Sequence, residues 1–349
     1  MNYFRDIHIQ NFRGYEEIEL HSLERVNFFL GENNVGKTTL LESFFLLLGM
    51  TNPAIAWRIN ALRSSNNNNF GDLRFIFHNV DKNVPPVLSA TFNDGEERSI
   101  LLSTSSSITD AEVKDLKSID SSNQWNQLVA TIERRNVKGK PDFSGKTVLS
   151  VNSEGKIDGK GVDEYIEIQN ALFIATADSS VAGTFSDAIK KRKKDYIIEQ
   201  ARLFDPRINS IELLSDGLYI GFDNVEQLLP LSMNGIGLSK FLSIVCAAAC
   251  GSFHILLIDE IEDGLHYTAY QTLLKALYQF AEQNDMQFFI TTHSLDTLQH
   301  LSKLVENTPE YSAMTCVYSL SRTKKGIKNY RYEGSDFVNA INNQIELRK

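Results

Sequence analysis

The sequence predicts an α/β protein with a phosphate-binding core, and three observations support that prediction. The loop "GENNVGKT" lies between an apolar strand-like run and an apolar helix. Two later runs, "FHILLIDE" and "MQFFITTHS", have the composition of buried strands and end in polar residues. Several runs between these segments alternate apolar and polar residues, as antiparallel strands do. We therefore expect a core of buried strands and helices with an added β lobe.

The N-terminal half should begin with three strands, "YFRDIHIQNF", "YEEIEL" and "RVNFFL", because each has a strand-like pattern. A helix is predicted from Lys37 to about Met50. The polar tract "RSSNNNNFGD" is expected to form an exposed loop. Over residues 73–165, the antiparallel lobe is predicted from the runs "RFIFHNV", "PPVLSATF", "RSILLST" and "KTVLSVNS".

The C-terminal half should begin with a helix from Ser186 to about Leu203, with Ser186 and Asp187 as candidate caps. A hairpin is expected in "IELLSDGLYIGF", turning at Asp216-Gly217. The small apolar residues of "LSKFLSIVCAAAC" predict a buried helix. One more strand, "MTCVYSL", and a helix near "DFVNAINNQIEL" complete the predicted elements.

The composition is that of an ordinary globular protein, with 349 residues, 42% of them hydrophobic and 23% charged. The net charge of −9 argues against coating nucleic acid by bulk attraction, although a local basic patch stays possible. The three cysteines do not suggest a secreted disulfide framework. No signal-like N-terminus or membrane-length apolar stretch is evident. We therefore expect a cytoplasmic protein that does not contact a membrane.

The loop fits the pattern G-x-x-x-x-G-K-[ST] in its strand-to-helix context, which disfavours a chance match. Glycines permit backbone conformations in which consecutive N–H groups point at phosphate oxygens, and the helix N-terminus adds positive potential. Lys37 is expected to pair with the β- and γ-phosphates, and the Thr38 hydroxyl to bind Mg²⁺. The predicted ATP-binding residues of this loop are Gly31, Glu32, Asn33, Asn34, Val35, Gly36, Lys37, Thr38 and Thr39.

Two other strand ends carry candidate catalytic groups. Asp259 follows a buried apolar run, where a second Mg²⁺ ligand is expected. Glu260, the next residue, is a candidate for polarising the attacking water. His293 follows another buried run and could contact the γ-phosphate or that water, although a lone histidine is more often structural. Glu262 and Asp263 could support the metal site or simply begin the next helix.

With these motifs the chain resembles the ABC-type ATPases of the RecF, SMC and Rad50 class. Its closest likeness is to overcoming-lysogenization-defect (OLD) proteins and related bacterial defence ATPases. The residues that carry the resemblance are "IQNFRGYEEIEL", "GENNVGKTTLLES", "LPLSMNGIGLSKFLSIV", "ILLIDEIEDGLHYTAYQTLL" and "QFFITTHSLDTL". The fold implied is an α/β P-loop ABC-type ATPase head with an antiparallel β lobe and a helical insertion. Its nucleotide-binding core would span residues 1–60 and 205–349, and the β lobe and helical arm residues 61–204.

In such ATPases two heads enclose two ATP molecules, and a signature segment of one head contacts the γ-phosphate bound by the other. The resemblance places that segment at "SMNGIGLSK", with Lys240 where the family often has arginine, a change that loses the bidentate fork. It places His266 in the dimer-contacting loop, and the Q-loop at Phe173 to Ser180, without the usual glutamine. The further nucleotide-side residues that it implies are Asn11, Arg13, Ser232, Gly235, Gly237 and Lys240.

The resemblance also implies partners. A homodimer or larger homo-oligomer is expected around ATP and Mg²⁺, with slow hydrolysis coupled to a change in assembly. OLD proteins carry a C-terminal metal-dependent nuclease (Toprim) domain, but few acidic residues cluster after His293. The chain therefore resembles the ATPase alone, and any effector, such as a nuclease or toxin, should be a separate protein. An ATP-stabilised scaffold that restrains a partner, or a DNA-repair ATPase like RecF, remains an alternative.

Two weaker features have simpler explanations beside the functional ones. The basic run "KKRKK" could contact nucleic-acid phosphates, although such a run is more often a solvated helix face. Its residues are Lys190, Lys191, Arg192, Lys193 and Lys194. Cys246 and Cys250 share a predicted helix face, but without further metal ligands nearby they are better explained as core residues.

Overall fold

The computed structural model describes residues 3–61, 63, 72–104, 127–151, 157–160, 171–175, 181–265, 267–324 and 326–348. The chain divides into two compact units, which are described one at a time. The first unit comprises Met1–Leu23, Asn34–Ile168 and Ser321–Asn329. The second unit comprises Glu24–Asn33, Gln169–Leu320 and Tyr330–Lys349.

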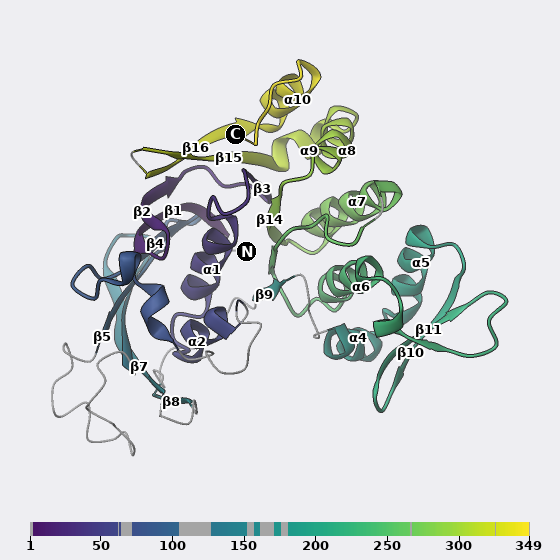
Figure 1. Ribbon diagram of the computed structural model, residues 1–349, viewed down its shortest axis with the longest axis horizontal. Helices are drawn as coiled ribbons and strands as arrows, with labels where there is room; N and C mark the ends of the chain where they lie inside the picture. Colours follow the sequence, from purple (N-terminus) through teal and green to yellow (C-terminus); the bar gives the residue numbers. More distant parts are fainter. Residues whose placement is uncertain are drawn as a thin grey trace. The chain divides into compact units, whose positions relative to one another are not determined.

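The first unit contains a seven-stranded antiparallel sheet among its described residues, in the order β2-β1-β4-β5-β6-β7-β8 (Figure 1). Alternate residues of the central strands are buried, as in β4, so one sheet face forms a core. Helix α1 packs on β4 and β5, and its Phe44 contacts Phe4 edge to face. The elements are β1 Phe4–Phe12, β2 Tyr15–Leu20, α1 Lys37–Leu48, α2 Ala54–Ala61, η1 Leu73–Ile76, η2 His78–Val80, β4 Val87–Phe92, β5 Glu97–Thr104, β6 Gln127–Arg135, β7 Pro141–Val151 and β8 Ile157–Lys160.

The second unit is built on a six-stranded sheet of described strands, in the order β16-β15-β3-β14-β13-β9. The pairs β15/β3, β3/β14, β14/β13 and β13/β9 are parallel. Every residue of β3, β13 and β14 is buried, which explains their largely apolar composition. The strands are β3 Val26–Leu30, β9 Ala171–Ile174, β13 Ile255–Ile258, β14 Gln287–Thr292, β15 Thr315–Thr323 and β16 Gly326–Glu333.

Helices and a small sheet complete the second unit. Helices α4 and α5 lie beside the β10–β11 hairpin and also pack on α6, and α8, α9 and α10 pack together (Figure 1). Among the described residues, no helix has the length and apolar character needed to cross a membrane. The elements are α4 Val181–Lys190, α5 Lys194–Phe204, β10 Ile208–Leu214, β11 Gly217–Phe222, β12 Leu229–Pro230, η5 Leu231–Met233, α6 Ile236–Ala249, α7 Tyr267–Gln283, α8 Leu295–Glu306, α9 Pro309–Met314 and α10 Gly334–Asn342.

Several local predictions were wrong for identifiable reasons. The run "RFIFHNV" forms two 3₁₀ turns instead of a strand, because the Asp72 side chain caps the first by accepting from the Arg74 N–H. The helix predicted from Ser186 is two helices, because Arg192 between them adopts a φ of 59°. Ser186 and Asp187 therefore lie inside α4 and are not caps.

The predicted hairpin is present, but its turn lies one residue earlier. Leu214 pairs with Gly217, so Ser215 and Asp216 are the turn residues. Strand β16 was not predicted, because its sequence is half polar and exposed. The predicted loop "RSSNNNNFGD" lies almost wholly outside the described residues.

Candidate active site

The phosphate-binding loop begins where the parallel strand β3 ends and leads directly into α1. Three of its residues have positive φ, namely Gly31 at 149°, Asn34 at 63° and Gly36 at 113°. This confirms the conformational reason for the glycines, since side chains rarely adopt such angles. Gly36 is the N-cap of α1 and no side chain caps it. The positive end of the helix dipole favours an anion at this helix N-terminus, as a phosphate site requires.

Within the first unit, hydrogen bonds brace the part of the loop that begins at Asn34. The Tyr15 hydroxyl donates to the Gly36 carbonyl at 3.0 Å, and a Cβ at Gly36 would lie 2.9 Å from that hydroxyl. Arg322, in the same unit, donates to the Asn34 carbonyl at 3.1 Å. Lys37 is buried, Thr39 is buried and accepts from Arg63 at 2.9 Å, and Thr38 is half-buried. These contacts hold the residues from Asn34 to Thr39 within the first unit.

Helix α1 also carries a buried acid that the sequence analysis did not single out. Glu42 is 1% exposed and pairs with Arg13 at 2.8 Å and with Arg63 at 2.6 Å. Arg13 also donates to the Asn60 side chain at 2.8 Å. Burial lowers the pKa of Arg13 to about 10, against the opposing effect of Glu42, so its guanidinium stays charged at neutral pH. Arg13 therefore anchors the β1–β2 turn to α1.

Asn11, near the end of β1, also has a positive φ, of 56°. The Asn11 amide donates to the carbonyl of Pro85 at 3.5 Å. Within the first unit, Arg13 thus joins the hairpin turn to α1, and Asn11 joins the end of β1 to Pro85. Their predicted contact with nucleotide stays a prediction.

In the second unit, the carboxyl ends of β13 and β14 bring together the residues of "DE" and "TTHS". The two strands are paired in parallel, with Ile258 opposite Ile290, so both end at one edge of the sheet. The Thr291 hydroxyl donates to an Asp259 carboxylate oxygen at 2.6 Å and accepts from the Glu260 N–H at 2.7 Å. Thr291 is fully buried and was missed by sequence reasoning, although it is the first polar residue of "TTHS".

Glu260 follows with a φ of 45°, an unusual backbone angle for a residue with a side chain. Burial raises the pKa of its carboxyl, and the carboxylates of Asp263 and Asp259 add to this rise, whereas His293 opposes it. A carboxylate with raised proton affinity is suited to accepting a proton from water. The local backbone strain is of the kind that clusters at functional sites.

Glu262 contacts His293. Glu262 is buried, and its carboxylate accepts from the backbone N–H of His293 at 2.7 Å. The same carboxylate lies 2.8 Å from the ring Nδ1 of His293. Nε2 is then the ring nitrogen that could contact a phosphate or a water. The side chain of His293 is 43% exposed, so such a contact is sterically possible.

The predicted signature segment occupies η5 and the start of α6. Ser232 and Gly235 are exposed, and nothing lies within 4 Å of a Cβ placed at Gly235. Gly237 instead packs against the backbone of Gly264, with which a Cβ would overlap. Gly264 has a φ of 69°, and its own Cβ would lie 2.6 Å from the Gly237 nitrogen. Two glycines thus allow α6 to approach the loop after β13.

The Lys240 side chain contacts the backbone of its own chain. Its side chain is buried, and its ammonium donates to the carbonyl of Asp259 at 2.6 Å and to that of Glu260. Burial lowers the pKa of Lys240, and the nearby carboxylates, Asp263 first, oppose this shift. In this structure Lys240 therefore positions the backbone that presents the two acids. His266 and residues 176–180 of the predicted Q-loop lie outside the described residues.

The phosphate-binding loop, the two acids after β13 and the mixed α/β architecture together define an ABC-type ATPase of the RecF and SMC class. The chain belongs to the AAA_21 family, described as "AAA domain, putative AbiEii toxin, Type IV TA system", whose model matches residues 26–298. It is an ATPase, as the family and the relatives described next indicate.

Two curated relatives match most of the chain. One is an ATP/GTP phosphatase of Helicobacter pylori, 21% identical, with 98% of this chain and 99% of the relative covered. Another is the DNA replication and repair protein RecF of Streptococcus uberis, 20% identical, with 86% of this chain and 95% of the relative covered. Among solved structures, an SMC head bound to the C-winged helix domain of ScpA superposes with a TM-score of 0.52 at 11% identity. The superposition covers 95% of this chain and 98% of that chain. This last likeness concerns the fold alone.

Replacing Lys37 with alanine should weaken ATP binding about tenfold to a hundredfold, because a hydrogen bond to a charged group contributes roughly 1.5–3 kcal/mol. Titration of a fluorescent ATP analogue measures this loss. Lys275→Ala, an exposed lysine on α7, is the matched control and should bind like the wild type. Equal affinities for Lys37→Ala and the wild type would contradict the role of the loop.

Proposed function

We propose that the protein is an ATP-gated assembly factor whose two heads enclose ATP and Mg²⁺, and that it controls a separate effector in bacterial anti-phage defence. The observation that carries the proposal is the start of α6. Met233 is 80% exposed and Ile236 58% exposed, on either side of the accessible Gly235. Large apolar side chains placed together at a backbone suited to phosphate contact favour a surface that a second copy covers.

The proposed chemistry assigns each residue one task. Lys37 and the N–H groups of residues 32–38 bind the phosphates. Oxygen donors suit Mg²⁺, and Thr38 and Asp259 supply a hydroxyl and a carboxylate, the latter oriented by Thr291. When bound, the ion would neutralise phosphate charge. Glu260 accepts a proton from the attacking water, and His293 contacts the γ-phosphate.

The role in defence rests on the likeness to OLD-type ATPases and on the family description, which refers to a toxin–antitoxin system. The effector, a nuclease or toxin, would be a separate protein. If the protein were only a scaffold, a partner complex would form and dissociate equally well in Lys37→Ala.

The direct test measures molar mass by light scattering with and without ATP and Mg²⁺. Wild type should double its mass, or increase it further, when ATP is present. Ile236→Asp should prevent the increase, because it places a charge within the proposed interface. Leu203→Asp, at a 63% exposed position on α5, is the matched control and should assemble normally. A mass that does not respond to ATP would refute the proposal.

The likeness to RecF favours one second candidate, a DNA-repair ATPase. The basic run lies between α4 and α5, where Lys191, Arg192 and Lys193 are exposed and Lys194 pairs with Glu212 at 2.8 Å. The basic run thus connects two helices and does not form one continuous helix face. ATPase activity stimulated by DNA at low salt, and lost when these three residues are changed to glutamate, would select this candidate.

A further inference from the structure

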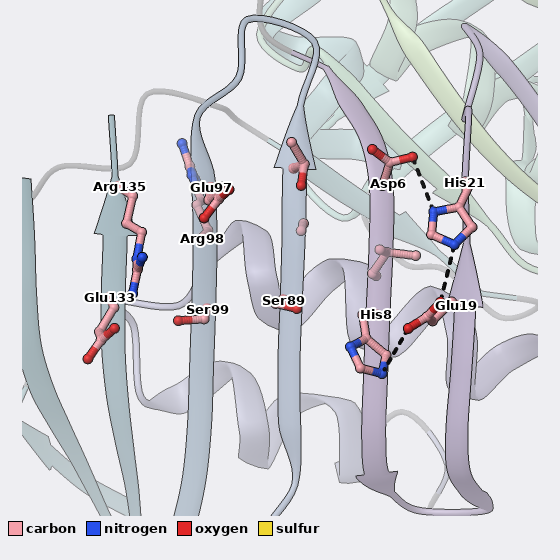
Figure 2. Close-up of a pocket in the computed structure, with 13 residues that line it drawn as sticks. Asp6, His8, Glu19, His21, Ser89, Glu97, Arg98, Ser99, Glu133 and Arg135 are labelled. Carbon is pink, nitrogen blue, oxygen red and sulfur yellow. Dashed lines mark hydrogen bonds and ion pairs between the residues drawn. The ribbon is translucent and has the colours of Figure 1, made fainter. Parts of the chain in front are cut away.

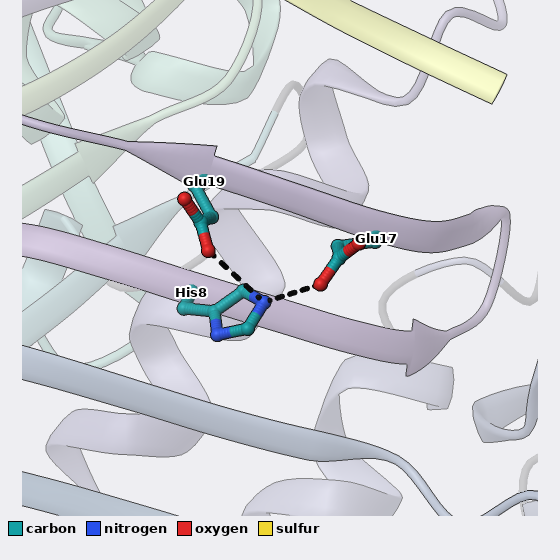
Figure 3. A group of neighbouring side chains, drawn as sticks. All are labelled: His8, Glu17 and Glu19. Atoms are coloured by element: carbon teal, nitrogen blue, oxygen red, sulfur yellow. Dashed lines mark hydrogen bonds and ion pairs between the residues drawn. The ribbon is translucent and has the colours of Figure 1, made fainter. Parts of the chain in front are cut away.

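The outward face of the seven-stranded sheet carries a group of ionisable side chains apart from the ATPase residues. In the β1–β2 hairpin, His8 lies opposite Glu19 and Gln10 opposite Glu17. The intervening residues face the core and are buried, namely Ile7, Ile9, Ile18 and Leu20. The strand period of two therefore places His8, Glu17 and Glu19 together on the outer face (Figure 3).

The ligand atoms of these three residues converge. His8 Nε2 lies 2.9 Å from Glu17 Oε1 and 3.5 Å from Glu19 Oε1, and the three ligand atoms lie within 4.8 Å of one another. Around a tetrahedral ion with bonds of about 2.0–2.2 Å, ligand atoms are roughly 3.3–3.6 Å apart. Small side-chain rotations would reach that geometry. Two carboxylates on one strand face also repel each other, which a cation would relieve.

Neighbouring side chains already orient these groups. The second oxygen of Glu19 lies 3.2 Å from His21 Nε2, and His21 Nδ1 lies 3.5 Å from Asp6 (Figure 2). Gln10 donates to Glu17 at 2.9 Å. Hydrogen-bond partners of this kind hold metal ligands in place in established sites. A cavity of about 370 Å³ along the same sheet face gives access from solvent.

We propose that His8, Glu17 and Glu19 bind one divalent transition-metal ion of the zinc type, with water completing the coordination. An imidazole beside carboxylates suits Zn²⁺, whereas Mg²⁺ prefers oxygen ligands alone. The ion bonds to the Nε2 lone pair of the neutral His8 ring that carries its proton on Nδ1, so a proton on Nε2 would move to Nδ1, or to solvent where the ring carries two protons. This site is independent of the ATP site and of the function proposed above.

Binding would have a structural consequence for the first unit. The same hairpin carries Arg13 and Tyr15, which contact Glu42 and Gly36. An ion that joins β1 to β2 would stabilise the strand pairing from which these contacts extend. We therefore expect zinc to raise the thermal unfolding midpoint of the protein.

The test uses the whole protein, treated with chelator, dialysed and titrated calorimetrically with ZnCl₂ without nucleotide. One Zn²⁺ should bind His8, Glu17 and Glu19 per chain, with affinity reduced tenfold or more in His8→Ala and Glu19→Gln. Glu16→Gln, on the same strand but outside the group, and His300→Ala, on α8, are matched controls and should keep wild-type affinity at this site.

Two further readouts keep the proposal falsifiable. If His8→Ala does not fold, Glu17→Gln, at an exposed position, replaces it. Co²⁺ should give the visible absorption of a four- or five-coordinate centre in the wild type and lose it in Glu17→Gln. Absence of Zn²⁺ binding, or equal affinity in the wild type and all three ligand variants, would overturn the proposal.

Discussion

Replacing Glu260 with glutamine should lower ATP turnover by about 10²- to 10⁴-fold, the usual contribution of a positioned general base. Glutamine keeps the size of the side chain but cannot accept the proton of the attacking water. ATP binding should change little, because the phosphate contacts come from the loop after β3. Turnover is measured by phosphate release under saturating ATP, and binding by titration of a fluorescent analogue.

An exposed glutamate of the same unit provides a control for Glu260→Gln. Glu282→Gln changes an exposed glutamate of α7 in the same unit and should leave turnover intact. Lys240→Met should reduce turnover as well, since it removes the ammonium that holds the Asp259 and Glu260 carbonyls. If Glu260→Gln hydrolyses ATP at the wild-type rate, another residue must activate the water.

The second large effect should come from Glu42, which no motif marks. Glu42→Ala should reduce the free energy of unfolding by about 3–5 kcal/mol, the usual cost of removing one partner of a buried ion pair. Arg63 is 41% exposed and can turn to solvent, but the Arg13 side chain is only 9% exposed. In the variant, the charge of Arg13 would stay buried with fewer partners. Denaturant unfolding followed by circular dichroism measures the loss.

Asp142→Ala is the matched control for Glu42. Asp142 pairs with Arg134 at 3.1 Å, but their side chains are 32% and 24% exposed, so the change should cost less than about 1 kcal/mol. Equal destabilisation by the two variants would show that burial does not set the strength of the Glu42 pairs. Such a result would also contradict the bracing of α1 by Arg13.

Much of the candidate active site could be predicted from sequence, because the sequence patterns that indicate it are local. Gly31 and Gly36 adopt the backbone angles that a phosphate-binding loop needs, and Asp259 and His293 follow buried parallel strands. The apolar composition of β3, β13 and β14 directly reflects burial on both faces. Where signals were weak or mixed, as in "RFIFHNV" or the helix split at Arg192, the prediction was wrong.

The sequence by itself determined the phosphate-binding loop, the strand-borne acids and the α/β class, because glycine conformation and strand burial depend on nearby residues. Only the tertiary structure decided which distant residues meet. Lys240 contacts the carbonyls of Asp259 and Glu260, Thr291 orients Asp259, and Gly237 packs on Gly264. These contacts depend on the pairing of strands and helices separated by tens of residues, and no local pattern records that pairing.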